Sequence, residues 1–361
     1  MPGSHNCSSC EISTLETSSV LFAMENYVIP IVVSLGIGCN ILALMVLRKL
    51  KEKSTFHQSL LALATCDICF LSLILMDYSK QILIQFHIIV FPYFLNPMLN
   101  IFLCLGSFLI MSITTERFLA IYKPFLYRTH KLRHSARVHL LTYILPPVIL
   151  AVLINIPKFL EAEFNVRNKT SSDNISIEAL DFTFTSLRIN PIYIYFYTHW
   201  TRLLITGILP FSCLLVMNIL IFITINRSKR LTIKYQANTI RSRKFSKSTL
   251  TLASIVFLYL VCNTPRLLLN CVEYYYFSAM MESDFCLCSW TTYLFELLLI
   301  INHLFLVINS SANIFIYFLT SKTFKQTLLL KLRLTRKNSI SNNATLTLGA
   351  QGDTVYHEAI L

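Results

Sequence analysis

Long apolar windows alternate with short polar segments along most of the chain. Seven of these windows are long enough to cross a bilayer, because about 20 apolar residues span its hydrocarbon core. They lie near residues 24–48, 57–82, 92–122, 136–159, 192–226, 248–276 and 290–319. Unpaired backbone groups cannot face lipid, so each window is predicted to be a helix even where prolines interrupt it. The pattern predicts an all-α membrane protein built as a seven-transmembrane helix bundle over residues 24–320.

The segments outside the bundle differ in character from one another. Residues 1–23 are polar and lack the basic start and apolar core of a signal peptide, so the first window is expected to serve as its own insertion signal. Residues 321–333 place leucines and Phe324 opposite basic side chains, which predicts a short amphipathic eighth helix lying on the membrane lipids. Residues 334–361 are low in aromatic residues and are predicted to be a disordered tail.

Composition supports a membrane protein and excludes a soluble domain. Hydrophobic residues make up 55% of the chain, charged residues only 14%, and the mean hydropathy is +0.60. The formal net charge of +13 comes from Lys and Arg that gather beside alternate window ends, in segments 48–53, 123–137, 227–247 and 322–337. By the positive-inside rule, the amino terminus is predicted outside the cell and the carboxyl terminus in the cytosol. Because the charge is dispersed over membrane-flanking loops, no nucleic-acid partner is predicted.

Several polar side chains stand inside the apolar windows, where they are costly and are kept for a mechanism. Because buried polar groups require partners, a polar network is predicted in the middle of the membrane. Its expected members are Asn40, Asp67, Asn309, Ser310 and Asn313. Plain hydrogen bonding between helices is the structural alternative for Asp67, and a snorkelling side chain is the alternative for Arg117 at the end of the third window.

Other classes of membrane protein fit the sequence less well. A transporter is expected to show an internal repeat around a site at the midplane, and the two halves of the chain show no self-similarity. The histidines His87, His199 and His303 are isolated, and neither metal-ligand spacing nor a paired-carboxylate arrangement is present. We therefore predict neither an enzyme nor a bound cofactor.

A set of motifs follows the windows in order. They are Gly38-Cys39-Asn40, Leu63-Ala64-Thr65-Cys66-Asp67, Glu116-Arg117-Phe118, Pro210, Cys262-Asn263-Thr264-Pro265, Asn313 to Tyr317, and Phe324. From Gly38 to about Lys331 the chain resembles a rhodopsin-like (class A) G-protein-coupled receptor. The segments Asn155 to Glu161, Ser186 to Tyr193 and Cys262 to Arg266 resemble invertebrate neuropeptide receptors of the FMRFamide type. This narrower resemblance implies a peptide ligand that ends in an amidated Arg-Phe.

The resemblance also implies how the switch works. Glu116 is expected to hold Arg117 in the resting state and to release it to a heterotrimeric G protein. Cys262, Asn263 and Pro265 form the expected hinge of the sixth helix, whose inner half swings outward when an agonist binds. Asn313 and Tyr317 are expected to move with it. Phosphorylation of the tail is expected to recruit an arrestin, and the family implies location in the plasma membrane.

Four departures from the family pattern affect these expectations. Asn263 stands where the family usually has a Trp, and Ile314 replaces a proline, which is expected to leave the seventh helix straighter. Gly106 stands where a third-helix hydroxyl is expected, so a sodium ion near Asp67 stays an open alternative. The family bridge from the third helix to the second outer loop cannot form, because its helix position reads Pro92 and residues 160–190 contain no cysteine.

The predicted outer segments carry further candidate sites. The outer cysteines are Cys7, Cys10, Cys286 and Cys288, and a disulfide between the tail and the third outer loop is possible with its connectivity open. Glycosylation sequons begin at Asn6, Asn168 and Asn174. All three fall on segments that the charge pattern places outside.

Acidic and aromatic residues near the outer helix ends are the candidates for ligand binding. A basic and aromatic peptide terminus would find charge pairing and cation–π partners there. The candidates are Asp77, Trp200, Glu273, Tyr276, Tyr293 and Glu296. Leu99 stands where receptors for amines carry an Asp, so an amine ligand is disfavoured. An orphan receptor, a decoy that does not signal and a receptor for a non-peptide ligand remain the alternatives.

Overall fold

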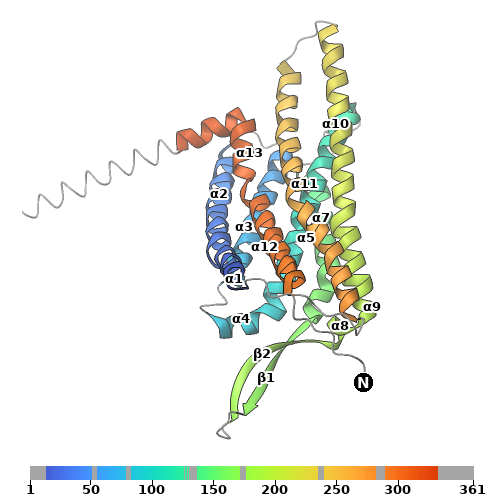
Figure 1. The fold of residues 1–361 in the computed structure, drawn as a ribbon. Helices are drawn as coiled ribbons and strands as arrows, with labels where there is room; N and C mark the ends of the chain where they lie inside the picture. Colours follow the sequence, from blue (N-terminus) through green and yellow to red (C-terminus); the bar gives the residue numbers. More distant parts are fainter. Residues whose placement is uncertain are drawn as a thin grey trace, which may run out of the picture.

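The computed structural model describes residues 14–50, 55–78, 83–125, 127, 129, 136–170, 176–234, 240–281 and 289–331. In these residues seven helices are long and apolar enough to cross a membrane: Ser19–Lys49, Phe56–Tyr78, Ile84–Tyr122, Leu141–Leu160, Pro191–Arg227, Thr249–Val272 and Leu294–Ser311. They run side by side as one bundle (Figure 1). The predicted seven-helix fold is therefore confirmed.

Several spans are built from consecutive helical elements. The first three spans consist of α1 (Thr14–Ala23), η1 (Met24–Val28) and α2 (Ile29–Lys49), then α3 (Thr55–Tyr78), then α4 (Ile84–Val90), η3 (Phe91–Leu95) and α5 (Asn96–Tyr122). The fourth and fifth consist of α7 (Ala136–Asn155) and η4 (Ile156–Leu160), then α8 (Ser186–Ile189), α9 (Pro191–Tyr193), η5 (Ile194–Ile208) and α10 (Leu209–Lys234). The last two are α11 (Ile240–Met281), then α12 (Ser289–Ser311) and α13 (Asn313–Thr320). Residues 14–23, which the sequence assigned to the tail, are helical and continue into the first span.

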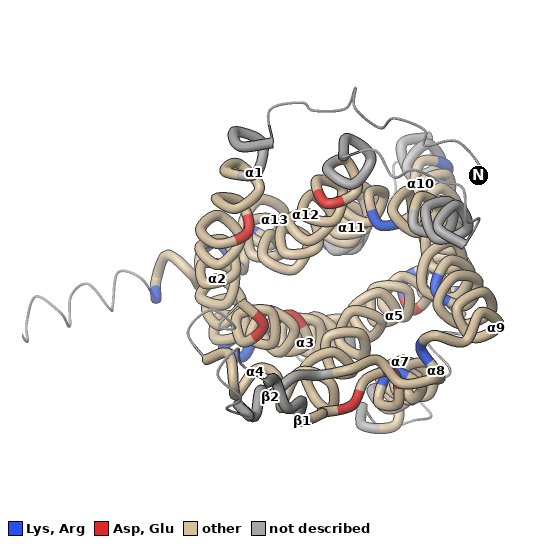
Figure 2. The backbone as a smooth tube through the Cα atoms, turned by 60° about the horizontal axis from the view of Figure 1, so that its bottom comes forward, with Lys and Arg blue, Asp and Glu red and all other residues tan. Residues whose placement is uncertain are grey.

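The outside of the bundle is apolar. Large hydrophobic side chains such as Leu35, Phe222 and Phe257 are exposed, and Figure 2 shows few charged positions around the ring of helices. Hydroxyl groups on the spans bond back to their own helix, as Thr224 Oγ1 does to the Leu220 carbonyl at 2.8 Å. A surface of this kind suits lipid as the solvent, because apolar side chains face outward and such hydroxyl groups are already bonded within their own helix.

Irregular turns interrupt several of the spans, and those of the fifth and seventh spans are described here. The fifth span contains a long π-helix, η5, over Ile194–Ile208. Its wider turn rotates side chains away from the positions that a regular α-helix gives them. The seventh span breaks between α12 and α13 at Ala312, whose ψ is −5°. The break forms although residue 314 is Ile and not a proline, and the expectation of a straighter seventh helix stays a prediction.

A β-hairpin projects from one end of the bundle and was not predicted. Strand β1 (Ala162–Thr170) pairs antiparallel with β2 (Ser176–Phe184), with Ala162 opposite Phe184. Figure 1 shows the hairpin beyond the ends of the helices, near α4 and α8. This end is called the hairpin end below, and the end where α10 and α11 extend furthest is called the opposite end.

Gly36 marks a close contact between the first and seventh spans. A Cβ added at Gly36 would overlap Ser311 Oγ and would come within 2.8 Å of Ser311 Cβ, whereas a Cβ at Gly38 meets nothing within 4 Å. We expect Gly36→Ala to lower the free energy of unfolding by about 1–3 kcal/mol through overpacking. Gly38→Ala on the same helix should leave stability unchanged or slightly raised. Thermal unfolding of the two purified variants checks this, and equal midpoints would contradict it.

Candidate functional site

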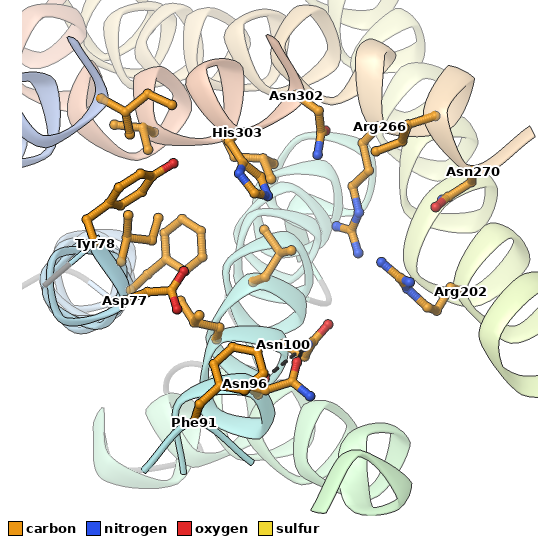
Figure 3. A pocket seen from close by; sticks show the side chains of 18 residues that line it. Asp77, Tyr78, Phe91, Asn96, Asn100, Arg202, Arg266, Asn270, Asn302 and His303 are labelled. Carbon is orange, nitrogen blue, oxygen red and sulfur yellow. Dashed lines mark hydrogen bonds between the residues drawn. The ribbon is translucent and has the colours of Figure 1, made fainter. Parts of the chain in front are cut away.

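A cavity of about 330 Å³ opens between the helices toward the hairpin end. Its volume lies in the range of pockets that bind small ligands or the end of a peptide. Its polar lining consists of Asp77, Tyr78, Asn96, Asn100, Arg202, Arg266, Asn270, Asn302 and His303 (Figure 3). These side chains come from the second, third, fifth, sixth and seventh spans, so the cavity exists only when the spans are assembled.

One wall of the cavity carries an acid. Asp77 stands near the end of α3, and its Oδ1 lies 2.9 Å from Nε2 of His87 on α4. The His87 ring stacks on Phe91, with 5.1 Å between the ring centroids. Asp77 was predicted from the sequence as a ligand-binding candidate, and the structure places it in the cavity wall. A cationic ligand group would meet a carboxylate here.

The opposite wall carries two guanidinium groups. Figure 3 shows the heads of Arg202, from η5, and Arg266, from α11, pointing toward each other. Arg266 is only 5% exposed, and its Nη2 donates to Thr206 Oγ1 at 3.1 Å. Its Nη1 is buried without a hydrogen-bond partner. The cavity is therefore bipolar, with an acid on one side and two cations on the other.

The remaining ligand-binding candidates lie elsewhere or cannot be placed. Trp200 is partly exposed and packs on Tyr195 and His199, outside the cavity lining. Glu296 lies on α12 but does not line the cavity. The side chains of Glu273, Tyr276 and Tyr293 lie outside the part of the chain that the structure describes.

Sequence reasoning missed the two arginines and the seventh-helix pair Asn302 and His303. A signal for them was present, because Arg202 and Arg266 are charged residues in the middle of apolar windows. Such residues almost always face the interior of a bundle. The candidates were chosen as acidic and aromatic residues that could pair with a basic peptide, so the two arginines were not among them.

The predicted polar network is assembled near the middle of the bundle. Asn313 Nδ2 donates to Asp67 Oδ2 at 2.7 Å, and Asn40 Nδ2 donates to the Ser310 carbonyl at 2.8 Å. A small cavity of about 20 Å³ beside Asp67 is also lined by Asn309. That volume holds a single water-sized species. Whether a sodium ion binds there stays a prediction.

The opposite end of the third span holds the predicted switch residues. Glu116 Oε1 accepts a hydrogen bond from the Tyr127 hydroxyl at 2.9 Å. The Arg117 guanidinium lies over the ring of Phe56, 3.8 Å from its centroid. The sequence predicted Glu116 as the partner of Arg117. In the structure the ring of Phe56 contacts Arg117. The resting pair of Glu116 and Arg117 stays a prediction.

Tyr317 is also buried at this end, and the hinge of the sixth span is buried nearer the middle of the bundle, where Asn263 lines the small cavity beside Asp67. The Tyr317 ring packs edge-on against Phe324, with 5.5 Å between centroids, and its hydroxyl has no hydrogen-bond partner. Phe324 belongs to residues 322–331, which are helical where the eighth helix was predicted. In α11, Cys262 and Asn263 are buried beside Pro265, and Asn263 Nδ2 donates to the Tyr259 carbonyl at 2.9 Å.

Noncovalent contacts hold the β-hairpin in place. Lys158 Nζ lies 2.8 Å from Glu161 Oε1, and both side chains are buried. The Tyr193 hydroxyl donates to the same carboxylate at 2.7 Å. The Phe164 amide donates to the Tyr93 hydroxyl at 3.1 Å, which ties β1 to η3 beside Pro92. The bond to Tyr93 joins the third span to the loop at the place where the family bridge is missing.

The predicted modification sites are placed only in part. Asn168 lies in β1, whereas Asn6 and Asn174 lie outside the described residues. The four outer cysteines, Cys7, Cys10, Cys286 and Cys288, also lie outside them. The cysteines that the structure describes are free thiols. The disulfide and the glycosylation stay predictions.

Seven membrane helices thus surround a polar network, with a ligand-sized cavity toward one end of the bundle and Arg117 near the other. The model of the 7 transmembrane receptor (rhodopsin family) matches residues 39–325. The chain therefore belongs to the rhodopsin family of seven-transmembrane receptors, which is a class of signalling receptors and not of enzymes.

Two curated relatives resemble the chain at modest identity. The FMRFamide receptor of Drosophila melanogaster is 25% identical over 355 residues, which cover 92% of this chain and 60% of the relative. A probable G-protein coupled receptor of Caenorhabditis elegans is 26% identical over 256 residues, covering 66% of this chain and 56% of the relative. The chain thus spans less than two thirds of the length of either relative.

The buried pair under the hairpin generates a stability prediction. Glu161→Gln leaves the buried Lys158 ammonium without its charge partner, so we expect a loss of about 3 kcal/mol or more in the free energy of unfolding. Glu163→Gln, at an exposed position of β1, should change little. Thermal unfolding of the purified proteins and the amount of receptor at the cell surface check this. Equal behaviour of the two variants would show that the pair does not hold the hairpin.

Proposed function

We propose that the protein is a receptor for a neuropeptide, of the amidated FMRFamide-like class, that acts through a heterotrimeric G protein. The bipolar cavity is the observation that carries this proposal. A peptide end that bears a cation and an aromatic ring would find Asp77 on one wall and Tyr78 and Phe91 close by. The name of the Drosophila relative supports the same ligand class.

The orientation follows from the charge pattern and the site. The described residues of the basic segments lie toward the opposite end, as Arg48 does at the end of α2 and Lys123 does after α5. We place this end in the cytosol, and the hairpin end then faces outside the cell at the plasma membrane. In this orientation a peptide enters the cavity from outside. Arg117 stands at the cytosolic end, where a G protein would meet it and where an arrestin would follow phosphorylation of the tail.

Activation is proposed to couple the two ends through α11. This helix carries Arg266 in the cavity wall and continues past Pro265, where a backbone hydrogen bond is missing, to the opposite end. A ligand that moves the outer part of α11 would swing its inner part outward and free Arg117 from Phe56. Tyr317, whose hydroxyl is buried without a partner, is the residue expected to rearrange with it.

Signalling in cells tests the proposal. Cells that express the chain are challenged with a panel of amidated peptides, and calcium and cAMP are recorded. A response that requires an Arg-Phe-amide terminus is expected, and Arg117→Ala should abolish it at equal surface expression. Silence toward every peptide, with the receptor confirmed at the surface, would favour a non-peptide ligand or a decoy that does not signal.

The contact between Arg117 and Phe56 generates a second prediction. A desolvated cation–π contact contributes about 2 kcal/mol, so Phe56→Leu should raise signalling without ligand several-fold by weakening the resting state. Phe56→Tyr keeps the ring and should leave basal signalling near that of the wild type. Basal cAMP or calcium, normalised to surface expression, measures the effect. Unchanged basal signalling in Phe56→Leu would mean that this contact does not restrain the switch.

A further inference from the structure

The two arginines of the cavity have no acidic partner in the described part of the chain. The ion pairs found there join His87 to Asp77 and join Lys158 and Arg188 to Glu161. Arg266 is 5% exposed, and its Nη2 donates to Thr206. Its Nη1 is buried and has no acceptor. Two like charges therefore share one wall of a cavity among membrane helices.

This arrangement is unfavourable for the empty protein. A buried charge normally has a counter-charge, because desolvation is not repaid without one. The second guanidinium adds repulsion to that cost, and Figure 3 shows the two heads directed at each other. Charged residues at such a depth are kept for a function, most often recognition of a ligand or an ion. The missing counter-charge is then expected from the ligand.

We propose that Arg202 and Arg266 form a subsite for a carboxylate of the ligand. This inference rests on the proposed function in one respect, namely that the cavity is the ligand site. The carboxylate has two possible sources, a free carboxyl terminus or an acidic side chain of a peptide whose terminus is amidated. Either source presents the same planar pair of oxygens, which matches the donor geometry of a guanidinium.

The geometry also sets the direction of the ligand. Thr206 fixes one arm of Arg266 and leaves Nη1 as a donor, while Arg202 approaches from the neighbouring span. Asp77 lies across the cavity and would repel a carboxylate placed there. A ligand with an anionic and a cationic group would therefore bind in one orientation, with its anion between the arginines and its cation at Asp77.

The stability of the empty receptor gives the first test. Removal of an uncompensated buried charge should stabilise the protein, so Arg266→Gln is expected to raise the midpoint of thermal unfolding of the purified receptor without ligand. Arg188→Gln is the matched control, because Arg188 lies 3.7 Å from Glu161 and its loss should not raise the midpoint. A lower midpoint for Arg266→Gln would show that the guanidinium is structural and would overturn the proposal.

Binding of small probes gives the second test and needs no known agonist. The probes are 3-phenylpropionate and its neutral isostere 3-phenylpropanamide, each titrated against the purified receptor at constant chloride. The acid should raise the unfolding midpoint and the amide should not. Arg266→Gln and Arg202→Gln should each weaken binding of the acid by about 30-fold or more, as for loss of one partner of a buried charge pair. Equal effects of the two probes, or binding of the acid that survives both substitutions, would overturn the proposal.

Signalling assays with peptides then distinguish the two sources of the carboxylate. They also distinguish failure of the carboxylate subsite from failure of the proposed receptor function. Peptides are prepared with an acid or an amide terminus, each with Asp or Asn at one internal position. If potency falls when the acid terminus is changed to an amide, the carboxylate that binds the arginines is the carboxyl terminus. If potency falls when Asp is changed to Asn, it is the acidic side chain. If neutral peptides activate as well as the acidic ones, the receptor function stands and the carboxylate subsite falls. If no peptide activates but the acid probe binds through both arginines, the subsite stands and the peptide assignment falls.

Discussion

The absence of water from the bilayer interior is the constraint on which the rest of the structure depends. In hydrocarbon every backbone group must bond within its own segment, so each apolar window becomes a helix. Polar side chains that remain must find partners inside the bundle. The bond from Asn313 to Asp67, at 2.7 Å, and the bond from Asn40 to the Ser310 carbonyl, at 2.8 Å, join the first, second and seventh spans in this way. The polar network thus holds the helices in one arrangement.

The same constraint applies to the buried charges under the hairpin and to the arginines of the cavity. Under the hairpin, the Lys158 and Glu161 charges are buried but paired, and Tyr193 adds a hydrogen bond to the carboxylate. The arginines of the cavity are the contrast, since Arg266 is buried to the same degree without a carboxylate beside it. The protein pairs its buried charges under the hairpin, whereas Nη1 of Arg266 has no hydrogen-bond partner among the described residues. This contrast directs attention to a ligand in the cavity.

Much of the fold and of the polar network was predictable because both depend on local composition. The windows predicted from the sequence overlap all seven spans, and Asp67 and Asn313, both predicted as members of the polar network, are hydrogen-bonded to each other. The ligand residues were less predictable. Asp77 lines the cavity and its binding role stays a prediction, whereas Trp200 lies outside the cavity lining and Arg202 and Arg266 were missed. The positions of acidic residues along the chain do not show which helix faces line the same cavity.

The sequence by itself determined the number of spans and the family, because hydrophobicity and motif order are properties of the chain. The tertiary structure alone decided which side chains share a cavity. That choice depends on the rotation of each helix, which the π-helical turns of η5 and the break at Ala312 alter. It also decided that a β-hairpin projects from one end and that Phe56 lies beneath Arg117. These contacts join residues far apart in the sequence, so no local pattern encodes them.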